Sequence, residues 1–362
     1  MDSMTKLSTP RGDLSLPAFL PDATRGAVRA LDSEDLSAIG VDALVVNTYH
    51  LSHSPGTKSI ERLGGIHSFM GWRGLVFADS GGFQIFSLLE DRNLQGKVTA
   101  KGFDYRRSGR GSRTLSPEKS ILWQHRLGAD VLVCLDHCTH PDADSSEQLQ
   151  SVEHTVSWAR DCKLKRDQLA DRTGRKIPLF AVIQGGRDRE LRRRCTDCLL
   201  ELGFDGYAFG GWPVGPSGQL LDAVHFVAEL VPREIPLWGL GIGKPENLVA
   251  AFRSGYRLFD CVLPTRDARH GRMYVFNGNP IDSAPTFYEH VYLADGPLRR
   301  SRAPLDPNCP GLCCRRFSRA YLGHLHAERD PLAMRLATIH NLCFYLELVK
   351  RLRIENDQKP DR

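Results

Sequence analysis

The chain repeats one hydrophobic pattern: a short apolar run followed at once by a polar, often glycine-containing cluster. A continuous apolar run of four or five residues is typical of a strand buried on both faces, as in a parallel sheet. The runs are 17–21, 43–46, 75–78, 131–135, 179–183, 207–209, 237–240 and 258–259. Helical patterns separate the later runs. This alternation predicts a (β/α)8 TIM-like barrel of the α/β class, whose functional residues lie where the strands end.

Helix boundary signals support this alternation. Ser116 offers an N-cap, Pro117 suits the first helical position, and Gly128 ends the same helix. Further helices are expected at 147–169, 188–202, 218–230 and 245–254. The segment 90–114 is rich in glycine and arginine without clear periodicity, which predicts a long, partly mobile loop over the barrel mouth.

The pattern changes after Asp260. Residues 271–329 are rich in turns and contain short β-like pieces such as 273–276, and a helical tail follows from about 331 to 353. We therefore interpret 1–270 together with 331–354 as a catalytic barrel. Residues 271–330 are expected to form a subdomain inserted before the last barrel helix.

Length and composition exclude several classes of protein. The 362 residues, 41% of them hydrophobic, are ample for one large barrel domain. No apolar run reaches the roughly 18–20 residues that a membrane span needs, and the N-terminus lacks the core of a signal peptide. Ten cysteines without an export signal favour reduced thiols and a cytoplasmic location.

The net charge of +5 is modest, but its distribution is uneven. Lys and Arg cluster at 101–113, 266–272 and 299–319. The first two clusters follow strand ends, where they could surround the mouth of the barrel. A phosphate-bearing partner and a solvated basic face would both explain them.

Three strand ends carry a carboxylate, namely Asp79, Asp136 and Asp260. A single aspartate at a strand end is often a cap or part of an ion pair, but three in one barrel weaken that explanation. Two carboxylates that converge on one mouth can act as nucleophile and general acid/base at a glycosidic carbon. The glycines after Asp79 would let a flat ligand approach the backbone.

A set of motifs from about residue 10 to 353 resembles the tRNA-guanine transglycosylase family. The motifs are Asn47-Thr-Tyr-His-Leu51, Asp79-Ser-Gly-Gly-Phe-Gln84, Leu115-Ser-Pro-Glu118, Gly203-Phe-Asp-Gly-Tyr207, Gly243-Lys-Pro245, Phe259-Asp-Cys-Val-Leu-Pro-Thr-Arg266 and Ser318-Arg-Ala-Tyr321. The resemblance implies a bacterial-type glycosyltransferase of queuosine biosynthesis. Such an enzyme exchanges the wobble guanine of tRNAs with GUN anticodons for a 7-deazaguanine, without ATP.

The expected incoming base is 7-aminomethyl-7-deazaguanine, with its nitrile precursor or queuine as alternatives. Two rival functions remain open: insertion of a deazaguanine into DNA, and service as a non-catalytic accessory subunit. The presence of both Asp79 and Asp260 argues against the accessory subunit.

The resemblance also implies roles for single residues. Asp260 would be the nucleophile on ribose C1′, and Asp79 the general acid/base. Asp136 would accept hydrogen bonds from the Watson–Crick edge of the purine, and Phe83 would stack on it. The other expected base-site residues are Asn47, which would help position Asp260, and Ser80, Gly81, Gly82, Gln184, Gly210, Gly211 and Leu240. Arg266 and Arg269 would bind the anticodon, and a homodimer is expected to hold the tRNA.

The family binds structural zinc through Cys-x-Cys-x-x-Cys and a later histidine. Cys309, Cys314 and His340 keep that spacing here, whereas Gly311 stands at the middle position and Cys313 is an additional thiol. Because structural zinc needs four donors, the expected set is Cys309, Cys313, Cys314 and His340. Cys343 is the reserve ligand, and loss of the site, with buried thiols in its place, is the alternative.

A second departure concerns the base. Bacterial members usually read Gly-Gly-Leu-Ala/Ser-Val-Gly-Glu, and this chain reads Gly210-Gly-Trp-Pro-Val-Gly-Pro216. The bulk of Val214 argues against queuine. Pro216 cannot supply the usual carboxylate for an aminomethyl cation, and Trp212 is expected to narrow or reshape the pocket.

Overall fold

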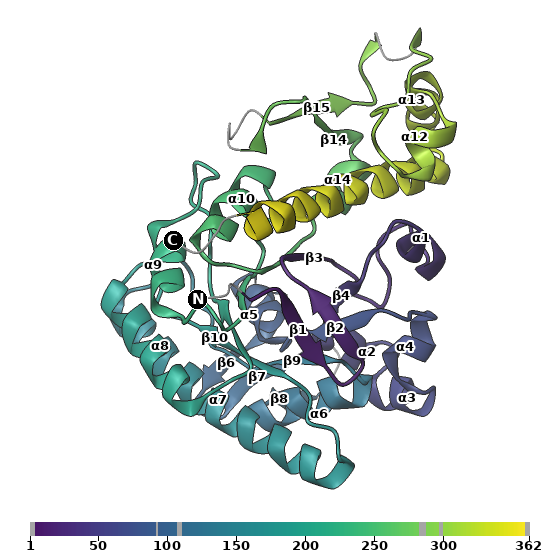
Figure 1. The fold of residues 1–362 in the computed structure, drawn as a ribbon. Helices are drawn as coiled ribbons and strands as arrows, with labels where there is room; N and C mark the ends of the chain where they lie inside the picture. The colour runs from purple at the N-terminus through teal and green to yellow at the C-terminus, as the bar shows by residue number, and fades with distance from the viewer. Residues whose placement is uncertain (1–3, 92, 107–110, 282–286, 297–299, 359–362) are drawn as a thin grey trace.

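The centre of the molecule is a closed, eight-stranded parallel barrel (Figure 1). The computed structural model describes residues 4–91, 93–106, 111–281, 287–296 and 300–358. Around the barrel the strands are β3 (Ala18–Pro21), β13 (Leu258–Cys261), β12 (Leu237–Gly239), β11 (Gly206–Phe209), β10 (Leu179–Ile183), β9 (Val131–Val133), β5 (Leu75–Ala78) and β4 (Ala43–Val46). A parallel bridge between Asp22 and Val45 joins the first strand of this order to the last. The predicted barrel is confirmed.

Helices alternate with these strands along the chain. They are α1 (Ser33–Ala38), α2 (Thr48–His53), α3 (Thr57–Arg62), α4 (Gly65–Met70), α5 (Gly82–Glu90), α6 (Pro117–Leu127), α7 (Ser145–Thr173), α8 (Arg189–Leu202), α9 (Asp222–Leu230), α10 (Pro245–Ser254) and α11 (Leu263–Arg269). Ser116 caps α6 by accepting a hydrogen bond from Lys119 N, and Gly128 ends that helix in the left-handed conformation. The predicted boundaries of α6 are confirmed.

One predicted helix begins too early. We expected a helix from 218, whereas α9 begins at Asp222. The preceding residues instead form a turn, in which Val214 pairs with Leu220 and Gly215 N donates to Gln219 O at 2.9 Å. The backbone groups that a longer helix would need are already paired in this turn.

The prediction of an irregular loop over 90–114 is wrong. An antiparallel sheet of β6 (Gln95–Thr99), β7 (Gly102–Arg106) and β8 (Ser112–Leu115) occupies most of it. Gly102 permits the β6–β7 turn, because its φ is +123° and a Cβ there would lie 2.1 Å from Leu115 O. Arg107 and Arg110 of the basic segment lie outside the described residues.

The barrel interior is a packed core. Its side chains include Leu20, Val45, Phe77, Val133, Phe180, Val182, Ala208, Trp238 and Leu258, which alternate along the strands with residues that face the helices. The rings of Phe77, Phe180 and Trp238 meet edge to face, with centroids 5.3–6.4 Å apart. A hairpin of β1 (Lys6–Thr9) and β2 (Gly12–Ser15) adds Leu7 and Leu14 to this core.

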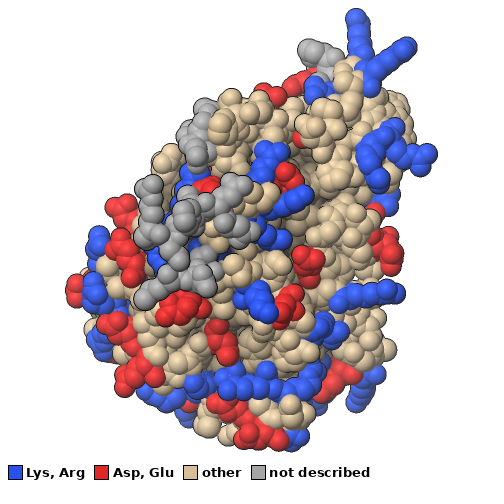
Figure 2. Space-filling view, viewed as in Figure 1, with Lys and Arg blue, Asp and Glu red and all other residues tan. Residues whose placement is uncertain are grey.

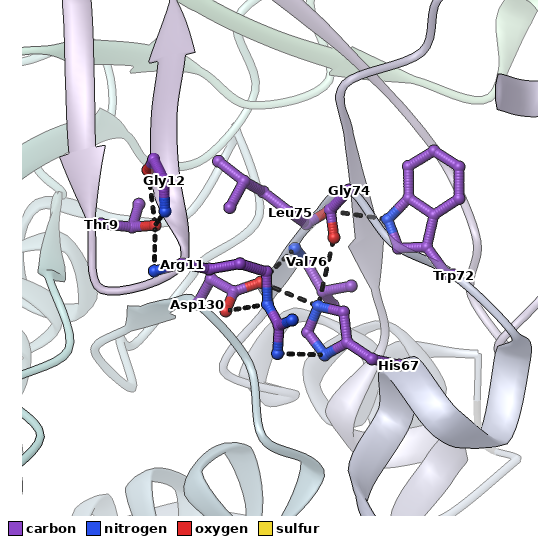
Figure 3. A network of polar contacts seen from close by, with 9 residues as sticks. All are labelled: Thr9, Arg11, Gly12, His67, Trp72, Gly74, Leu75, Val76 and Asp130. Atoms are coloured by element: carbon purple, nitrogen blue, oxygen red, sulfur yellow. Dashed lines mark hydrogen bonds and ion pairs between the residues drawn. The ribbon is translucent and has the colours of Figure 1, made fainter.

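A buried carboxylate fastens this hairpin to the amino-terminal end of the barrel (Figure 3). Asp130, directly before β9, accepts hydrogen bonds from Arg11 Nε and Val76 N, both at 2.9 Å. His67 Nε2 lies 2.9 Å from the second carboxylate oxygen and 3.2 Å from Gly74 O. The network joins the hairpin to the starts of two strands, at the end of a barrel where residues usually serve stability.

The chain continues beyond the barrel with a hairpin and three helices. These elements are β14 (Arg272–Phe276), β15 (Tyr288–Tyr292), α12 (Leu312–Arg316), α13 (Arg319–Ala327) and α14 (Pro331–Gln358). Figure 1 shows α14 between the barrel and the other four elements. Tyr345 on α14 packs against Phe19 with ring centroids 4.7 Å apart, and Arg353 Nε donates to Pro17 O at 2.8 Å. Arg299 of the third basic segment lies outside the described residues.

The last helix also explains an apolar stretch. Among the described residues, Pro331–Asn356 is the one helix that is long and apolar enough to cross a membrane. In the most apolar 18-residue stretch of this helix, however, 72% is buried inside the structure. Its apolar character is therefore that of a core helix.

Replacing Asp130 with alanine is expected to destabilise the fold by about 3 kcal/mol, because the variant leaves the buried His67 and Val76 N–H groups without their acceptor and removes the partner of Arg11. Urea unfolding would measure this change. The control is Asp13→Ala in the same hairpin, which breaks the exposed Lys6–Asp13 pair and should leave the unfolding midpoint nearly unchanged. Equal midpoints for the two variants would contradict the assignment.

Candidate active site

Four aspartates lie where strands of the barrel end. Asp22 directly follows β3, Asp79 directly follows β5, Asp136 comes shortly after β9, and Asp260 lies within β13. Because all eight strands are parallel, these residues share the carboxyl-terminal end of the barrel. Asp22 was not among the sequence-based candidates, although it directly follows the first predicted strand.

Asp79 is half-buried and held by the residues after β4. Asn47 Nδ2 donates to its Oδ2 and Thr48 N to its Oδ1, both at 2.8 Å. Burial raises the pKa of Asp79 to about 7, and the negative charges of Asp22 and Asp260 raise it further. Hydrogen bonds from backbone N–H groups lower this pKa and partly oppose the rise. Asn47 was expected to position Asp260; its amide instead contacts Asp79.

Asp260 is held from a neighbouring strand. Trp238 Nε1 donates to its Oδ1 at 2.8 Å, and Gly241 N reaches the same oxygen at 3.3 Å. Burial raises the pKa of Asp260 to about 7, and the charge of Asp22 contributes in the same direction. Neither of these hydrogen bonds uses Oδ2.

Asp136 and Gln184 form a second polar group. Gln184 Nε2 donates to Asp136 Oδ2 at 2.7 Å, and both side chains are buried. Burial raises the pKa of Asp136 to about 6, while hydrogen bonds from Gln184 and Ser80 partly oppose that rise. Gly210 makes room for this amide, because a Cβ there would lie 2.5 Å from Gln184 Nε2 and would displace it. A flat polar ligand can therefore meet a carboxylate, an amide and backbone together.

Arg192 holds the loops that carry these groups, and it was not predicted. Its buried guanidinium donates to Gly186 O and Gly210 O, each at 2.9 Å, and also to Ile183 O. It lies 4.2 Å from the centroid of the Phe209 ring. Burial lowers the pKa of Arg192 to about 10, which leaves it charged at neutral pH. The side chain thereby ties the end of β10 to the end of β11.

Two aromatic rings are exposed beside this polar group. Phe83 on α5 is 42% exposed and Trp212 after β11 is 41% exposed. Their centroids lie 6.0 Å apart in an edge-to-face arrangement, and Trp212 Nε1 donates to Thr139 O at 3.2 Å. Leu240 is partly buried and packs against the interior core. The exposed ring faces are available to a planar or cationic ligand.

Basic side chains gather at two places. Arg266 and Arg269 lie on α11, and the pKa of Arg269 is lowered first by burial and then by the positive charges of Arg29 and Arg266. The second place is a surface cavity of about 500 Å³, bounded by Arg302, Arg315, Arg316, Phe317 and Tyr321 among others. Figure 2 shows Lys and Arg projecting from the edge of the molecule where α12 and α13 lie. Both places suit a polyanion.

The expected metal ligands come together. The donor atoms of Cys309, Cys313, Cys314 and His340 all lie within 4.8 Å of one another. Cys313 Sγ and Cys314 Sγ are 3.7 Å apart, and His340 Nδ1 is 3.2 Å from Cys314 Sγ. His340 Nε2 lies 2.8 Å from Tyr274 O, a contact that leaves Nδ1 for a metal ion. The cluster is compatible with a structural metal site, and Cys343, which is not one of these four residues, interacts with Cys309 beside it.

Comparison with known proteins agrees with this arrangement. Residues 3–359 match the sequence profile described as Queuine tRNA-ribosyltransferase. The chain belongs to this family. It is similar to the queuine tRNA-ribosyltransferases of Psychrobacter sp. (39% identity over 96% of this chain and 88% of the relative) and Psychrobacter cryohalolentis (40%, with the same coverages). The relative from Solidesulfovibrio magneticus is 39% identical over 96% of this chain and 89% of its own length.

Membership makes the chain a tRNA-guanine transglycosylase, a pentosyltransferase of queuosine biosynthesis. Its substrates are accordingly a tRNA and an analogue of guanine. The coverages show that the match extends over nearly the whole chain, including the elements that follow the barrel.

The raised pKa values predict how stability depends on pH. The folded-state pKa of Asp260 is about 7 and its ordinary value is 3.8, so between these limits the folded state binds more protons than the unfolded state. The carboxyl group therefore costs stability as pH rises through this window, and the full cost is present above pH 7. Asp260→Asn should raise the Tm at pH 8 and leave it almost unchanged at pH 4, as measured by calorimetry. A larger gain at pH 4 than at pH 8 would contradict the raised pKa.

Proposed function

We propose that this chain exchanges the wobble guanine of tRNAs with GUN anticodons for 7-aminomethyl-7-deazaguanine through a covalent ribosyl intermediate on Asp260. The observation that carries the proposal is the pair of carboxylates at one end of the barrel. Asp79 and Asp260 both have a pKa of about 7, and the charge of Asp260 contributes to the pKa of Asp79. Two such groups can divide the roles of nucleophile and acid at one glycosidic bond.

In the first step, ionised Asp260 attacks ribose C1′ as the bond from C1′ to guanine N9 breaks. Protonated Asp79 gives its proton to the departing purine. In the second step, Asp79 takes a proton from the incoming base, whose N9 attacks C1′ and breaks the ester to Asp260. Both carboxyl groups return to their starting states, and a pKa near neutral suits a group that both gives and accepts a proton.

Base selection is supported by Asp136 and Gln184. Guanine and its 7-deaza analogues present N–H donors at N1 and N2, which an ionised Asp136 satisfies. Adenine presents an acceptor at N1, so its binding would leave the buried carboxylate without a donor from the base. Rejection on this basis is worth several kcal/mol in sites built to hydrogen-bond their substrate. Gln184 and Gly211 N–H would contact the carbonyl oxygen, and Phe83 would stack on the ring.

Selection at position 7 of the base is supported by Trp212. Pro216 stands where relatives of bacterial type carry a glutamate, so that carboxylate cannot bind an ammonium group here. The indole face of Trp212 offers a cation–π contact in its place, worth about 0.5–2 kcal/mol. The bulk of Val214 would oppose the large cyclopentenediol of queuine and so favours the small aminomethyl group over the side chain of queuine. The positive charge of the aminomethyl group, which Trp212 can bind, favours this base over the uncharged nitrile.

Zinc fits the Cys309, Cys313, Cys314 and His340 cluster. Three thiolates and one imidazole are a structural zinc set, and a Zn–S bond of about 2.3 Å places tetrahedral sulfurs about 3.8 Å apart. The separation of 3.7 Å between Cys313 Sγ and Cys314 Sγ agrees with this geometry. Zinc there would fasten α12 to α14 and supply no step of the reaction.

The remaining partners follow from the same proposal. The anticodon phosphates would lie against Arg266 and Arg269 on α11, the helix that begins shortly after Asp260 in the chain. The target base would leave its stack to reach the pocket, a step made easier by the single-stranded anticodon loop. We further propose that the protein acts in the cytoplasm as a homodimer, in which one subunit reacts and the other helps to hold the tRNA.

Exchange assays on anticodon stem-loops test the reaction. The protein should release labelled guanine from RNA with a wobble guanine when 7-aminomethyl-7-deazaguanine is supplied, and more slowly with the nitrile or queuine. Asp260→Ala should lower the rate by about a thousandfold or more, since it removes the nucleophile. Trp212→Leu should lower the preference for the aminomethyl base over the nitrile. Guanine release that survives in Asp260→Ala would refute the mechanism.

Metal analysis tests the zinc site. Purified protein should contain about one zinc per chain by mass spectrometry, and Cys313→Ser should lose most of it together with thermal stability. The comparison variant is Cys343→Ser, a buried cysteine that interacts with Cys309 but is not one of the four grouped donors, and it should retain the metal. Loss of zinc from the comparison variant alone would assign the fourth ligand to Cys343 instead.

A further inference from the structure

Asp22 occupies a central place at the reacting end of the barrel. It follows β3, which lies between the strand of Asp260 and β4, the strand that precedes Asn47. Leu20 pairs in register with Asp260, and Asp22 pairs with Val45. The next residue of β4, Val46, pairs with Ala78 directly before Asp79. Asp22 is thus on the strand segment that spans the interval between the nucleophile and the proposed acid.

Two hydrogen bonds hold the Asp22 carboxylate, and the same oxygen accepts both. Thr24 N donates to Asp22 Oδ1 at 2.8 Å, and Thr24 Oγ1 donates to the same atom at 2.5 Å. These bonds fix the carboxylate, and neither of them uses Oδ2. Asp22 is half-buried, so a ligand that enters the site can reach it.

Two ordinary explanations of a third acidic group fit poorly. Among the described residues, the one metal-ligand cluster is the cysteine–histidine group, and the aspartates of the barrel are not part of such a cluster. Arg269 is close enough for the charge of Asp22 to affect its pKa, but its guanidinium donates to Thr265 O at 3.1 Å. Among the described residues, Asp22 therefore belongs neither to the metal-ligand cluster nor to an ion pair that would explain its position.

We propose that Asp22 accepts a hydrogen bond from a ribose 2′-hydroxyl of the RNA segment bound at the reacting centre. The inference rests on the proposed function, because attack of Asp260 on C1′ brings the adjacent 2′-hydroxyl to the same end of the barrel. Hydrogen bonds from hydroxyl groups to carboxylates are short and strong. The 2′-hydroxyl is also the group by which a protein distinguishes RNA from DNA at a given position. Asp22 would make the enzyme selective for ribose.

The surrounding charges are consistent with this role. The charge of Asp22 raises the pKa of both Asp79 and Asp260, which shows that the three groups share one electrostatic environment. A neutral hydroxyl can satisfy Asp22 there without adding a positive charge. A cationic partner would instead lower the pKa of both neighbours and disturb their use as acid and nucleophile.

Single 2′-deoxy substitutions in the RNA test the proposal. Three anticodon stem-loops would be compared: all-ribose RNA, RNA with 2′-deoxy at the target guanosine, and RNA with 2′-deoxy at its 5′ neighbour. The natural protein should prefer all-ribose RNA by about tenfold or more in kcat/KM over one of the deoxy substrates. The position that loses activity identifies which ribose Asp22 contacts.

The variants then assign that preference to Asp22. Asp22→Ala should lose activity on all-ribose RNA, so that it turns over this RNA and the deoxy substrate disfavoured by the natural protein at nearly the same rate. Its preference for ribose, given as the ratio of the two kcat/KM values, therefore falls to about one. Asp22→Asn, which keeps the size of the side chain and one acceptor oxygen, should retain part of it. The ratio is insensitive to a general loss of folded protein, because one preparation turns over both substrates.

An unchanged preference in Asp22→Ala, or no preference at either position in the natural protein, would overturn the proposal. A natural protein without exchange activity on all-ribose RNA would count against the proposed function instead.

Discussion

Burial of acidic groups at the carboxyl-terminal end of the barrel is the constraint on which the site depends. Removal from water penalises the ionised form of a carboxyl group, and a neighbouring negative charge adds to that penalty. Asp79 and Asp260 experience both effects, and their pKa values rise to about 7. Hydrogen bonds from Thr48 N and Trp238 Nε1 limit the rise. The balance leaves each group able to change its protonation state near neutral pH.

The barrel supplies this environment through a rigid core. Trp238 packs against Phe77 and Phe180 in the interior and also donates its indole N–H to Asp260, so one side chain joins the core to the site. Arg192 does the same from outside the barrel, because its buried guanidinium holds the loops after β10 and β11. The hairpin fastened by Asp130 closes the opposite end. Stability and chemistry thus occupy opposite ends of the same strands.

Much of this arrangement can be predicted from the sequence. Strands buried on both faces give continuous apolar runs, and strand ends carry the chemistry, so the barrel and the positions of Asp79, Asp136 and Asp260 follow from the pattern. The β6–β8 sheet does not, because it packs a single face through residues such as Phe103 and Tyr105 and leaves the rest of its surface polar. Its strands therefore lack the continuous apolar run of the barrel strands.

Single side-chain contacts are harder still to predict. Arg192 lies in an arginine-rich stretch of α8, and the spacing of that stretch does not show which arginine is buried. Whether the amide of Asn47 reaches Asp79 or Asp260 depends on the offset between adjacent strands. The grouping of Cys313 with Cys314 depends on the short helix α12, which turns two adjacent thiols toward one point. Asp22 was visible as a strand-end carboxylate, and its relation to Asp79 and Asp260 emerges only from strand order.

The most direct test of the account is to find which residue becomes bonded to the RNA. The protein would be incubated with a wobble-guanine stem-loop and a base analogue that cannot complete the second step, then digested and analysed by peptide-mapping mass spectrometry. The account predicts that the ribosyl group is attached to Asp260. Attachment to Asp79, to Asp22 or to a residue outside the barrel end would contradict it.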